Sequence, residues 1–263
     1  MKLSGRSVLL TGASGGLGRA IARHLAAGGA ELILSGRRAD VLEELGTELG
    51  AEVVVADLAE RDAPARLAAR AAGVDVLVAS AGVPASGAIE EYTPEQIDRA
   101  LDVNLRASLQ LAALLMGEMI ARRRGALVFV SSIAGKSPAP GSALYAATKF
   151  GLRGFALCLR EDLRGTGVTV STVLPGFIRD AGMYADTGLA LPRGVGTRAP
   201  EHVAAAVARA IERGPAEIVV APVSVRVGAA LGSIAPGTVK RVTRLLGSHQ
   251  LSRQFAAAQR GKR

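Results

Sequence analysis

The stretch Ser7-Val8-Leu9-Leu10-Thr11-Gly12-Ala13-Ser14-Gly15-Gly16-Leu17-Gly18 decides the fold of this chain. Its first part is a short apolar run typical of a buried strand, and its second part is a glycine-rich turn. Apolar residues from Ala20 to Ala26 then follow with helical spacing, and we expect that helix to end at Gly28-Gly29. The pattern predicts a strand, a tight turn and a helix in direct succession.

The same alternation continues along the chain. Further strand-like runs lie at 32–34, 53–55, 74–78, 126–130, 168–173 and 217–220. Segments of helical composition lie between them, at 38–49, 59–72, 94–123, 145–164 and 200–213. Strands that alternate with helices and are apolar throughout indicate a parallel sheet covered on both faces. We therefore expect an α/β fold, a doubly wound Rossmann-type seven-stranded parallel sheet with helices on both faces.

Composition limits the class of protein. Of the 263 residues, 49% are hydrophobic and 21% charged, and no apolar run approaches the ~20 residues that span a bilayer. The chain enters a strand-like run almost at once, so we expect no signal peptide. Cys158 is the single cysteine, which excludes a disulfide within the chain and favours a reducing, cytoplasmic location. The histidines have no metal-ligand spacing, and no metal site is expected.

The positive charge is concentrated at one end. Residues 223–263 hold eight of the 32 basic residues and none of the 23 acidic ones. We expect a dinucleotide-binding and catalytic domain over 1–222, and a basic extension over 223–263 that packs on this domain or projects from it. Because the rest of the chain is nearly neutral, binding of nucleic acid is not expected.

The glycine turn suits a dinucleotide. Gly12, Gly16 and Gly18 allow close backbone approach, and the following helix offers free N–H groups and a partial positive charge to a pyrophosphate. Ser14 and Leu17 belong to the same predicted cofactor set. A tight turn without a ligand is the alternative, which the surrounding βαβ pattern makes less attractive.

The end of the second strand indicates which dinucleotide binds. NAD enzymes usually carry a carboxylate there for the ribose hydroxyls. This chain has Ser35-Gly36-Arg37-Arg38 instead. Guanidinium groups bind phosphate oxygens, which favours NADP(H) over NAD(H), and more strongly through Arg37 than through Arg38. Alternatively, the two arginines only begin a solvated helix.

Tyr145 and Lys149 stand four residues apart in a segment of helical spacing, so both side chains can enter one pocket. A nearby cation is expected to lower the pKa of a tyrosine towards working pH, as a general acid requires. Ser132 follows the apolar run 126–130, and its hydroxyl can hold a substrate oxygen beside the phenol. Taken alone, a Tyr-x-x-x-Lys pair occurs by chance in many helices.

Taken together, these motifs resemble the short-chain dehydrogenase/reductase family in its single-domain form, over roughly residues 5–222. The further matches are Asp57-Leu58 after the third strand, Ala81-Gly82, Asn104 in the long helix, and Pro175-Gly176 after the sixth strand. The resemblance implies that Tyr145 is the acid/base, that Lys149 lowers its pKa and holds the nicotinamide ribose, and that Ser132 orients the carbonyl. It also implies that Asn104 holds a water linked to Lys149, that Asp57 and Leu58 contact the adenine, and that Ile178 presents backbone to the carboxamide.

Two positions depart from the family pattern. Ala79-Ser80 replace the first half of its Asn-Asn-Ala-Gly motif, so part of the hydrogen bonding of the central sheet has to come from elsewhere, with Ser80 as one source. Asp180 stands where Thr is common, and a carboxylate near pyrophosphate is unfavourable unless Arg179 or a backbone donor offsets it. Asp180 is therefore left out of the predicted site.

The activity expected is NADP(H)-dependent interconversion of a carbonyl and a secondary alcohol on a mostly apolar small molecule. Segment 179–198 falls where the family has a substrate lid, with Met183, Tyr184, Leu189 and Leu191 as its apolar side; an ordinary surface loop fits nearly as well. The rival function is a non-catalytic NADP(H)-binding sensor or scaffold, although such a protein would not need Asn104, Ser132, Tyr145 and Lys149.

Assembly and location stay open at this level. The family commonly forms dimers or tetramers through its long helices, and Leu152, Phe155, Ala156 and Leu159 suit either such an interface or the core. In the extension, Val239, Val242, Leu245 and Leu246 oppose Lys240, Arg241 and Arg244 on a helical projection. Such a helix lies on an anionic membrane surface or, more often, packs on its own protein or on a partner subunit.

Overall fold

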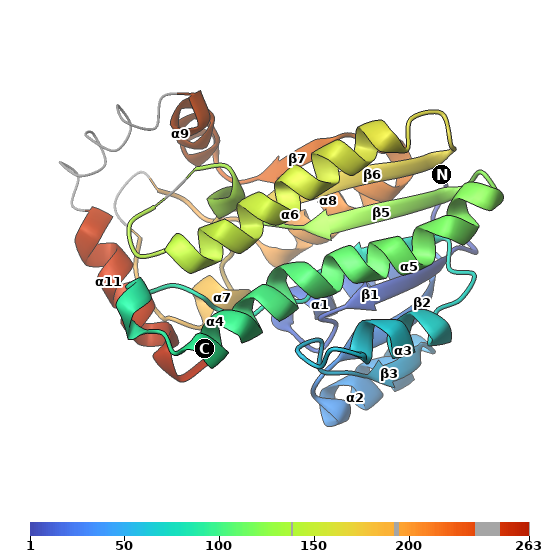
Figure 1. The fold of residues 1–263 in the computed structure, drawn as a ribbon, viewed down its shortest axis with the longest axis horizontal. Helices are drawn as coiled ribbons and strands as arrows, with labels where there is room; N and C mark the ends of the chain where they lie inside the picture. Colours follow the sequence, from blue (N-terminus) through green and yellow to red (C-terminus); the bar gives the residue numbers. More distant parts are fainter. Residues whose placement is uncertain (138, 192–194, 235–247, 263) are drawn as a thin grey trace.

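The computed structural model describes residues 1–137, 139–191, 195–234 and 248–262. Its centre is one parallel sheet with the strand order β3-β2-β1-β4-β5-β6-β7 (Figure 1). The strands are β1 (Ser7–Thr11), β2 (Glu31–Gly36), β3 (Glu52–Val55), β4 (Val76–Ala79), β5 (Gly125–Val130), β6 (Val168–Pro175) and β7 (Glu217–Val220). The expected seven-stranded, doubly wound α/β fold is confirmed.

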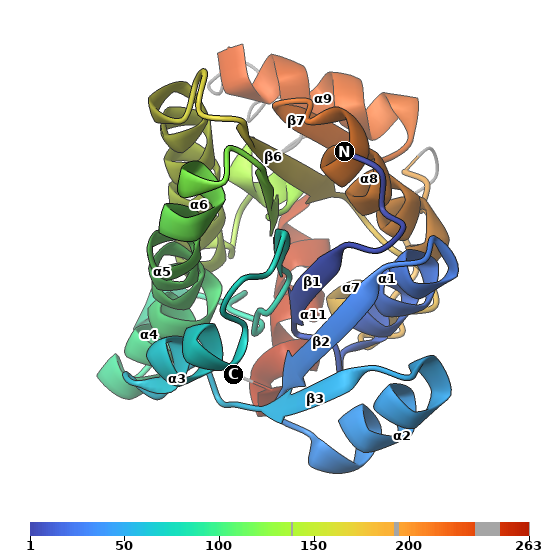
Figure 2. The same cartoon turned by 90° about the vertical axis from the view of Figure 1, so that its right-hand side faces the viewer.

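Helices cover both faces of the sheet, as Figure 2 shows. One face carries α1 (Gly16–Ala27), α2 (Ala39–Leu49) and α8 (Pro200–Arg213), and the other carries α3 (Ala63–Arg70), α4 (Pro94–Leu101), α5 (Ala107–Ala121) and α6 (Ala143–Asp162). The residues of β4 and β5 are buried without exception, because both faces of these central strands are covered. This burial explains why their sequences are continuous apolar runs rather than alternating ones.

The long helix expected over 94–123 is interrupted in the structure. Thr93 closes a capping box with Gln96 and starts α4. A π-helical segment, Asp102–Arg106, then separates α4 from α5. Single π-turns inside α-helices are frequently found at functional sites. Asn104 lies in this segment, so the interruption falls at a predicted catalytic position.

The remaining short elements gather at the carboxyl ends of the strands. These are η1 (Ile89–Glu91), η3 (Ile133–Gly135), α7 (Gly182–Ala185), α9 (Val223–Ile234), α11 (Ser248–Gln259) and η4 (Arg260–Lys262). In Figure 1 they form the left end of the molecule. The apolar and basic residues predicted to form a helix over 239–246 lie outside the described residues. In the described part of the chain, no helix combines the length and the hydropathy needed to cross a bilayer.

The four residues that suited either an interface or the core belong to the core of the single chain. Leu152, Ala156 and Leu159 are buried in the cluster beneath α5 and α6, and Phe155 packs against that cluster. The Phe155 ring meets Phe129 of β5 edge-on, with 5.7 Å between ring centroids.

Candidate active site

A cavity of about 1090 Å³ opens at the carboxyl ends of the strands. Its walls come from the glycine loop, the ends of β2, β4, β5 and β6, the first turn of α6, and the elements α7 and α11. The cavity lies where β1 has β2 on one side and β4 on the other, so that the chain winds away from it in both directions. Doubly wound sheets bind ligands at this switch point. The volume slightly exceeds the usual range for a single small ligand, as a site for a dinucleotide and a substrate would.

The glycine loop forms one end of the cavity. Gly12 has φ of +72°, and a Cβ added to it would lie 2.8 Å from Ala81 Cα. A Cβ on Gly16 would lie 3.1 Å from Ala181 Cβ, and one on Gly18 would collide with the carbonyl oxygen of Gly12. Only glycine therefore fits this turn, and α1 begins at Gly16 with its N-terminus beside the cavity. Ser14 and Leu17, which belong to the predicted cofactor set, also line the cavity.

Arg37 and Arg38 both line the cavity, but they differ in what they contact. Arg38 donates a hydrogen bond to the carbonyl oxygen of Ser14 and so braces the glycine loop. Among the described residues, no hydrogen bond engages the exposed guanidinium of Arg37. The positive charge of Arg37 acts instead on the nearby carboxylate of Asp57.

Asp57 and Leu58 follow β3. Leu58 lines the cavity, whereas the side chain of Asp57 is directed to its own neighbours. One Asp57 oxygen accepts the Ala59 N–H at 3.0 Å and the other accepts from Arg99 at 3.1 Å. Burial opposes ionisation of this carboxyl, but the two hydrogen bonds and the charges of Arg99 and Arg37 together outweigh it and lower its pKa. Of the predicted adenine pair, only Leu58 reaches the cavity wall.

Ala81 and Gly82 form the cavity floor after β4. The Thr11 hydroxyl accepts from Ser80 N–H at 3.1 Å and from Ala81 N–H at 3.2 Å. Thr11 thus ties β1 to the segment after β4 where the family's two asparagines are absent. A methyl group on Gly82 would lie 3.3 Å from Asn104 Oδ1 and 3.7 Å from Lys149 Nζ, so these two side chains flank Gly82 closely.

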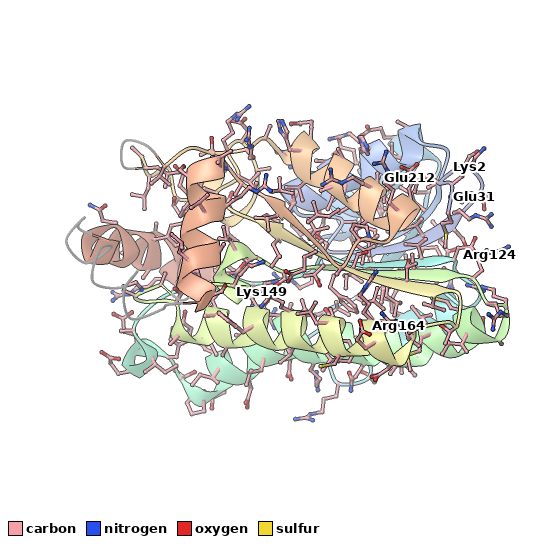
Figure 3. All side chains as sticks on the ribbon, turned by 90° about the horizontal axis from the view of Figure 1, so that it is seen from above. Lys2, Glu31, Arg124, Lys149, Arg164 and Glu212 are labelled. Atoms are coloured by element: carbon pink, nitrogen blue, oxygen red, sulfur yellow. The ribbon has the colours of Figure 1, made fainter. Side chains whose placement is uncertain are left out.

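Lys149, Tyr145 and Ser132 meet at the middle of the cavity. Lys149 is 3% exposed, and its Nζ donates to the carbonyl oxygen of Val130 at 3.2 Å while lying 5.7 Å from the centroid of the Tyr145 ring. Figure 3 shows Lys149 on the side of α6 that faces the sheet. Tyr145 is half-buried, and its hydroxyl forms a hydrogen bond with Ser132. The Ser131 hydroxyl donates to the carbonyl oxygen of Lys149 at 3.0 Å and holds α6 against the end of β5.

The electrostatics of this group differ from the expectation. We predicted that Lys149 lowers the pKa of Tyr145. Instead, desolvation by the cavity walls raises the pKa of Tyr145 to about 12, and the hydrogen bond with Ser132 only partly opposes this effect. Burial also lowers the pKa of Lys149 to about 8. At neutral pH the Tyr145 phenol therefore holds its proton, which is the form that can protonate an alkoxide.

The other side of the cavity follows β6. Pro175, Gly176 and Ile178 all line it. Ile178 forms a bridge with Arg198 that uses the Phe177 carbonyl oxygen and the Arg179 N–H. This arrangement leaves the N–H and the carbonyl of Ile178 itself outside the bridge and available to a ligand.

Asp180 has a left-handed backbone, with φ of +65°, and pairs with Arg179 at 3.3 Å. Arg179 thus supplies the offsetting charge that this carboxylate was expected to need.

Only some of the residues on the substrate side of the cavity were predicted from the sequence. Met183 and Tyr184 line the cavity from α7, as predicted for a lid, whereas Leu189 and Leu191 do not. Phe255 and Gln259 of α11 also line it and were missed. No sequence signal points to them, because the segment 248–259 has the composition of an ordinary solvated helix and reaches the cavity only through the tertiary fold.

With this geometry established, comparisons with known proteins identify the class. Residues 6–189 match the family model described as short chain dehydrogenase. The chain is 33% identical to the ketoacyl reductase HetN of Nostoc over 259 residues, 93% of this chain and 90% of that one. It is 41% identical to nodulation protein G of Rhizobium meliloti over 186 residues, 68% of this chain and 76% of that one. The NADP-bound 3-oxoacyl (acyl-carrier-protein) reductase of Agrobacterium tumefaciens superposes with a TM-score of 0.76 at 28% identity, covering 83% of this chain and 93% of that one.

The chain belongs to the short-chain dehydrogenase/reductase family. It is accordingly an oxidoreductase that acts with a nicotinamide cofactor on CH–OH or C=O groups.

Proposed function

We propose that this protein is an NADPH-dependent reductase of ketones on mostly apolar substrates, with 3-oxoacyl thioesters as the first class to test. The observation that carries the proposal is the meeting of Ser132, Tyr145 and Lys149 in one cavity with the glycine loop and Arg37. The ketoacyl reductases among the similar proteins support the choice of substrate class.

In this proposal the chain's residues have distinct roles. When bound, the cofactor supplies a hydride to the carbonyl carbon. Ser132 donates a hydrogen bond to the carbonyl oxygen, and Tyr145 gives its proton to that oxygen as negative charge develops there. The Lys149 cation, held beneath the phenol by Val130, stabilises the phenolate that remains.

Asn104 has a different proposed role from the water ligand implied by the resemblance. Its side chain is fully buried, and both of its polar groups bind the backbone of Val83. We propose that it acts by fixing the floor of the cavity beside Lys149. Binding of a water molecule by Asn104 would be an additional function beside this structural one.

Preference for NADP(H) is the second part of the proposal. The residues present fit the cofactor, because the close glycine turn at Gly12 and Gly18 has no room for a Cβ and Arg37 lines the cavity at the end of β2. The 2′-phosphate of NADP(H) would meet the Arg37 guanidinium, while none of the described carboxylates lines that part of the cavity to favour the ribose of NAD(H).

The test is loss of NADPH absorbance against a carbonyl panel of small ketones, long-chain aldehydes, steroids and 3-oxoacyl thioesters, with NADH as control. Turnover with 3-oxoacyl thioesters and NADPH is expected. Tight NADPH binding without turnover of any carbonyl would instead favour the sensor function, and absence of cofactor binding would contradict the proposal altogether.

We further propose that the catalytic body, residues 1–222, forms homodimers or homotetramers in the cytoplasm. Two large apolar side chains are exposed on its long helices, Leu114 on α5 and Phe150 on α6, at 51% and 39%. Sedimentation velocity on the protein and on Phe150→Asp tests this assignment. A monomer in both samples would contradict it.

A peripheral membrane contact is proposed for the extension, residues 223–263. Val223, Val227 and Leu231 are 68%, 52% and 53% exposed along α9, with Arg226 beside them. This apolar row lies in a segment that has eight basic and no acidic residues, which suits an anionic surface. Co-sedimentation with anionic but not neutral vesicles, lost in Val227→Ser/Leu231→Ser, is expected; equal binding by the double variant would end the idea.

A further inference from the structure

Helix α11 is distant in sequence from the other elements that line the cavity. Phe255 and Gln259 line the same cavity as Ser132 and Tyr145. Figure 1 shows α11 at the end of the molecule where the strands have their carboxyl ends, and its side chains contact α7. The family match ends at residue 189, so this wall of the cavity lies beyond the matched region.

Three aromatic rings join α11 to the end of β6. The Phe255 ring stacks on Tyr184 of α7, with 6.5 Å between centroids and 10° between planes. Tyr184 in turn meets Phe177 edge-on, with 5.3 Å between centroids and 67° between planes. Both arrangements are favourable for aromatic pairs. The row places the Phe255 ring on the substrate side of the cavity, beyond the lid.

Two polar contacts hold the end of α11 and the residue that follows it in place. Gln259 is 2% exposed, and its Nε2 donates to the Met183 carbonyl oxygen at 3.1 Å. Arg260 pairs with Glu91 of η1 at 2.7 Å. The C-terminal residues are therefore attached to α7 through Gln259 of α11, and to η1 through Arg260 of η4, which directly follows α11.

We propose that α11 is the outer wall of the substrate pocket and that Phe255 is a specificity-determining residue that limits substrate length. Gln259 is a positioning residue that holds α7 against this wall. The inference rests on the proposed reductase activity and deepens it. An acyl chain that extends from the reacting carbonyl past Met183 meets the phenyl ring, so long chains are disfavoured while short ones fit.

The experiment compares kcat/KM for 3-oxoacyl thioesters of increasing chain length in three variants. Phe255→Ala removes the ring and should raise the ratio of long-chain to short-chain kcat/KM, by about fourfold for each methylene newly accommodated. Phe255→Trp enlarges the ring and should lower the same ratio. Gln254→Ala, an exposed change on the same helix, should leave the ratio as in the wild type. NADPH affinity should be unchanged in all three.

A second readout does not depend on turnover. Hydrogen exchange of the amides of residues 182–189 should become faster in Phe255→Ala and stay unchanged in Gln254→Ala, because only the first loses the contact with Tyr184.

A ratio that does not move with either Phe255 variant, or a lid whose exchange is unaffected by Phe255→Ala, would overturn the proposal. Failure of the wild type to reduce any thioester contradicts the proposed function alone, and the exchange result then still decides the role of α11.

Discussion

The side chain of Asn104 and the backbone of Val83 exchange two hydrogen bonds. Asn104 Oδ1 accepts the Val83 N–H at 2.7 Å, and Asn104 Nδ2 donates to the Val83 carbonyl oxygen at 3.0 Å. The pair is fully buried on the Asn104 side and imitates one rung of a sheet. It connects the π-helical segment to the loop that follows Gly82, and thereby fixes the floor on which Lys149 lies.

Replacing Asn104 should destabilise the fold as well as the site. Asn104→Leu leaves two buried backbone groups of Val83 without partners, which costs on the order of 2–4 kcal/mol in the free energy of unfolding. Asn104→Asp keeps the acceptor and should lose less. Urea unfolding followed by circular dichroism measures both, and wild-type stability in Asn104→Leu would disprove the structural role.

Tyr145→Phe should lower turnover by roughly 10²–10⁴-fold, because the general acid is lost, while NADPH affinity changes little. The matched control is Tyr92→Phe. The Tyr92 hydroxyl donates a hydrogen bond of 3.0 Å to the carbonyl oxygen of Ser86 and has no part in the proposed proton transfer. Loss of this hydroxyl should therefore preserve turnover. If the two variants were equally active, the assignment of Tyr145 would be wrong.

Lys149→Met should stabilise the protein at neutral pH while abolishing activity. The buried Lys149 has a pKa of about 8, below its ordinary 10.5, so the unfolded chain binds more protons between these values. The wild type therefore gains stability as pH rises through that window, and the advantage of Met, on the order of 1–3 kcal/mol at pH 7, should shrink above about pH 8. Thermal melts at pH 7 and pH 10 test this prediction, and a constant difference would count against it.

Arg37→Glu should weaken NADPH binding by about tenfold or more and favour NADH, because a carboxylate repels the 2′-phosphate and suits free ribose hydroxyls. Arg61→Glu makes the same change of charge at an exposed position that does not line the cavity. Fluorescence titration of both cofactors measures the ratio of affinities. If the ratio of affinities shifted by a similar amount in both variants, the change in net charge would explain the effect, and a direct contact between Arg37 and the 2′-phosphate would be disproved.

Glu217→Gln should destabilise the protein at neutral pH but not in acid. Glu217 accepts from Lys136 at 3.0 Å and also from Arg153, and these partners outweigh burial and lower its pKa. Its contribution is present above the unfolded pKa of about 4.3 and is lost as pH falls through the lower folded value. The two unfolding midpoints should converge as pH falls below the lowered pKa that Glu217 has in the folded protein. Glu48→Gln, which breaks an exposed pair with Arg23, should have little effect at any pH.

Much of this fold could be predicted because its signals are local. Each strand is a short apolar run, and the observed bounds of β5 and β7, Gly125–Val130 and Glu217–Val220, differ little from the expected 126–130 and 217–220. The glycine loop could be recognised because a strand, a turn and a helix follow one another within residues 7–27.

What could not be predicted depends on contacts distant in sequence. The pKa of Tyr145 is raised because the cavity walls desolvate it, and no spacing rule contains that information. The π-helical interruption coincides with Asn104, whose side chain pairs with Val83, 21 positions away in sequence. Phe255 is held at the site by stacking on Tyr184 of α7, a contact that no sequence pattern indicates.

The π-helical segment Asp102–Arg106 also has a consequence for insertions and deletions. A π-turn accommodates one residue more than an α-helical turn. Deleting Val103 or Leu105 would therefore restore a regular helix and leave α4 and α5 close to their present orientation, because the π-turn absorbs its extra residue locally. Such a chain would keep every strand and every predicted catalytic side chain, yet it would lose the wide turn that presents Asn104 to Val83. A single-codon deletion here should therefore be far less tolerated than the substitution of any exposed residue in the same helix.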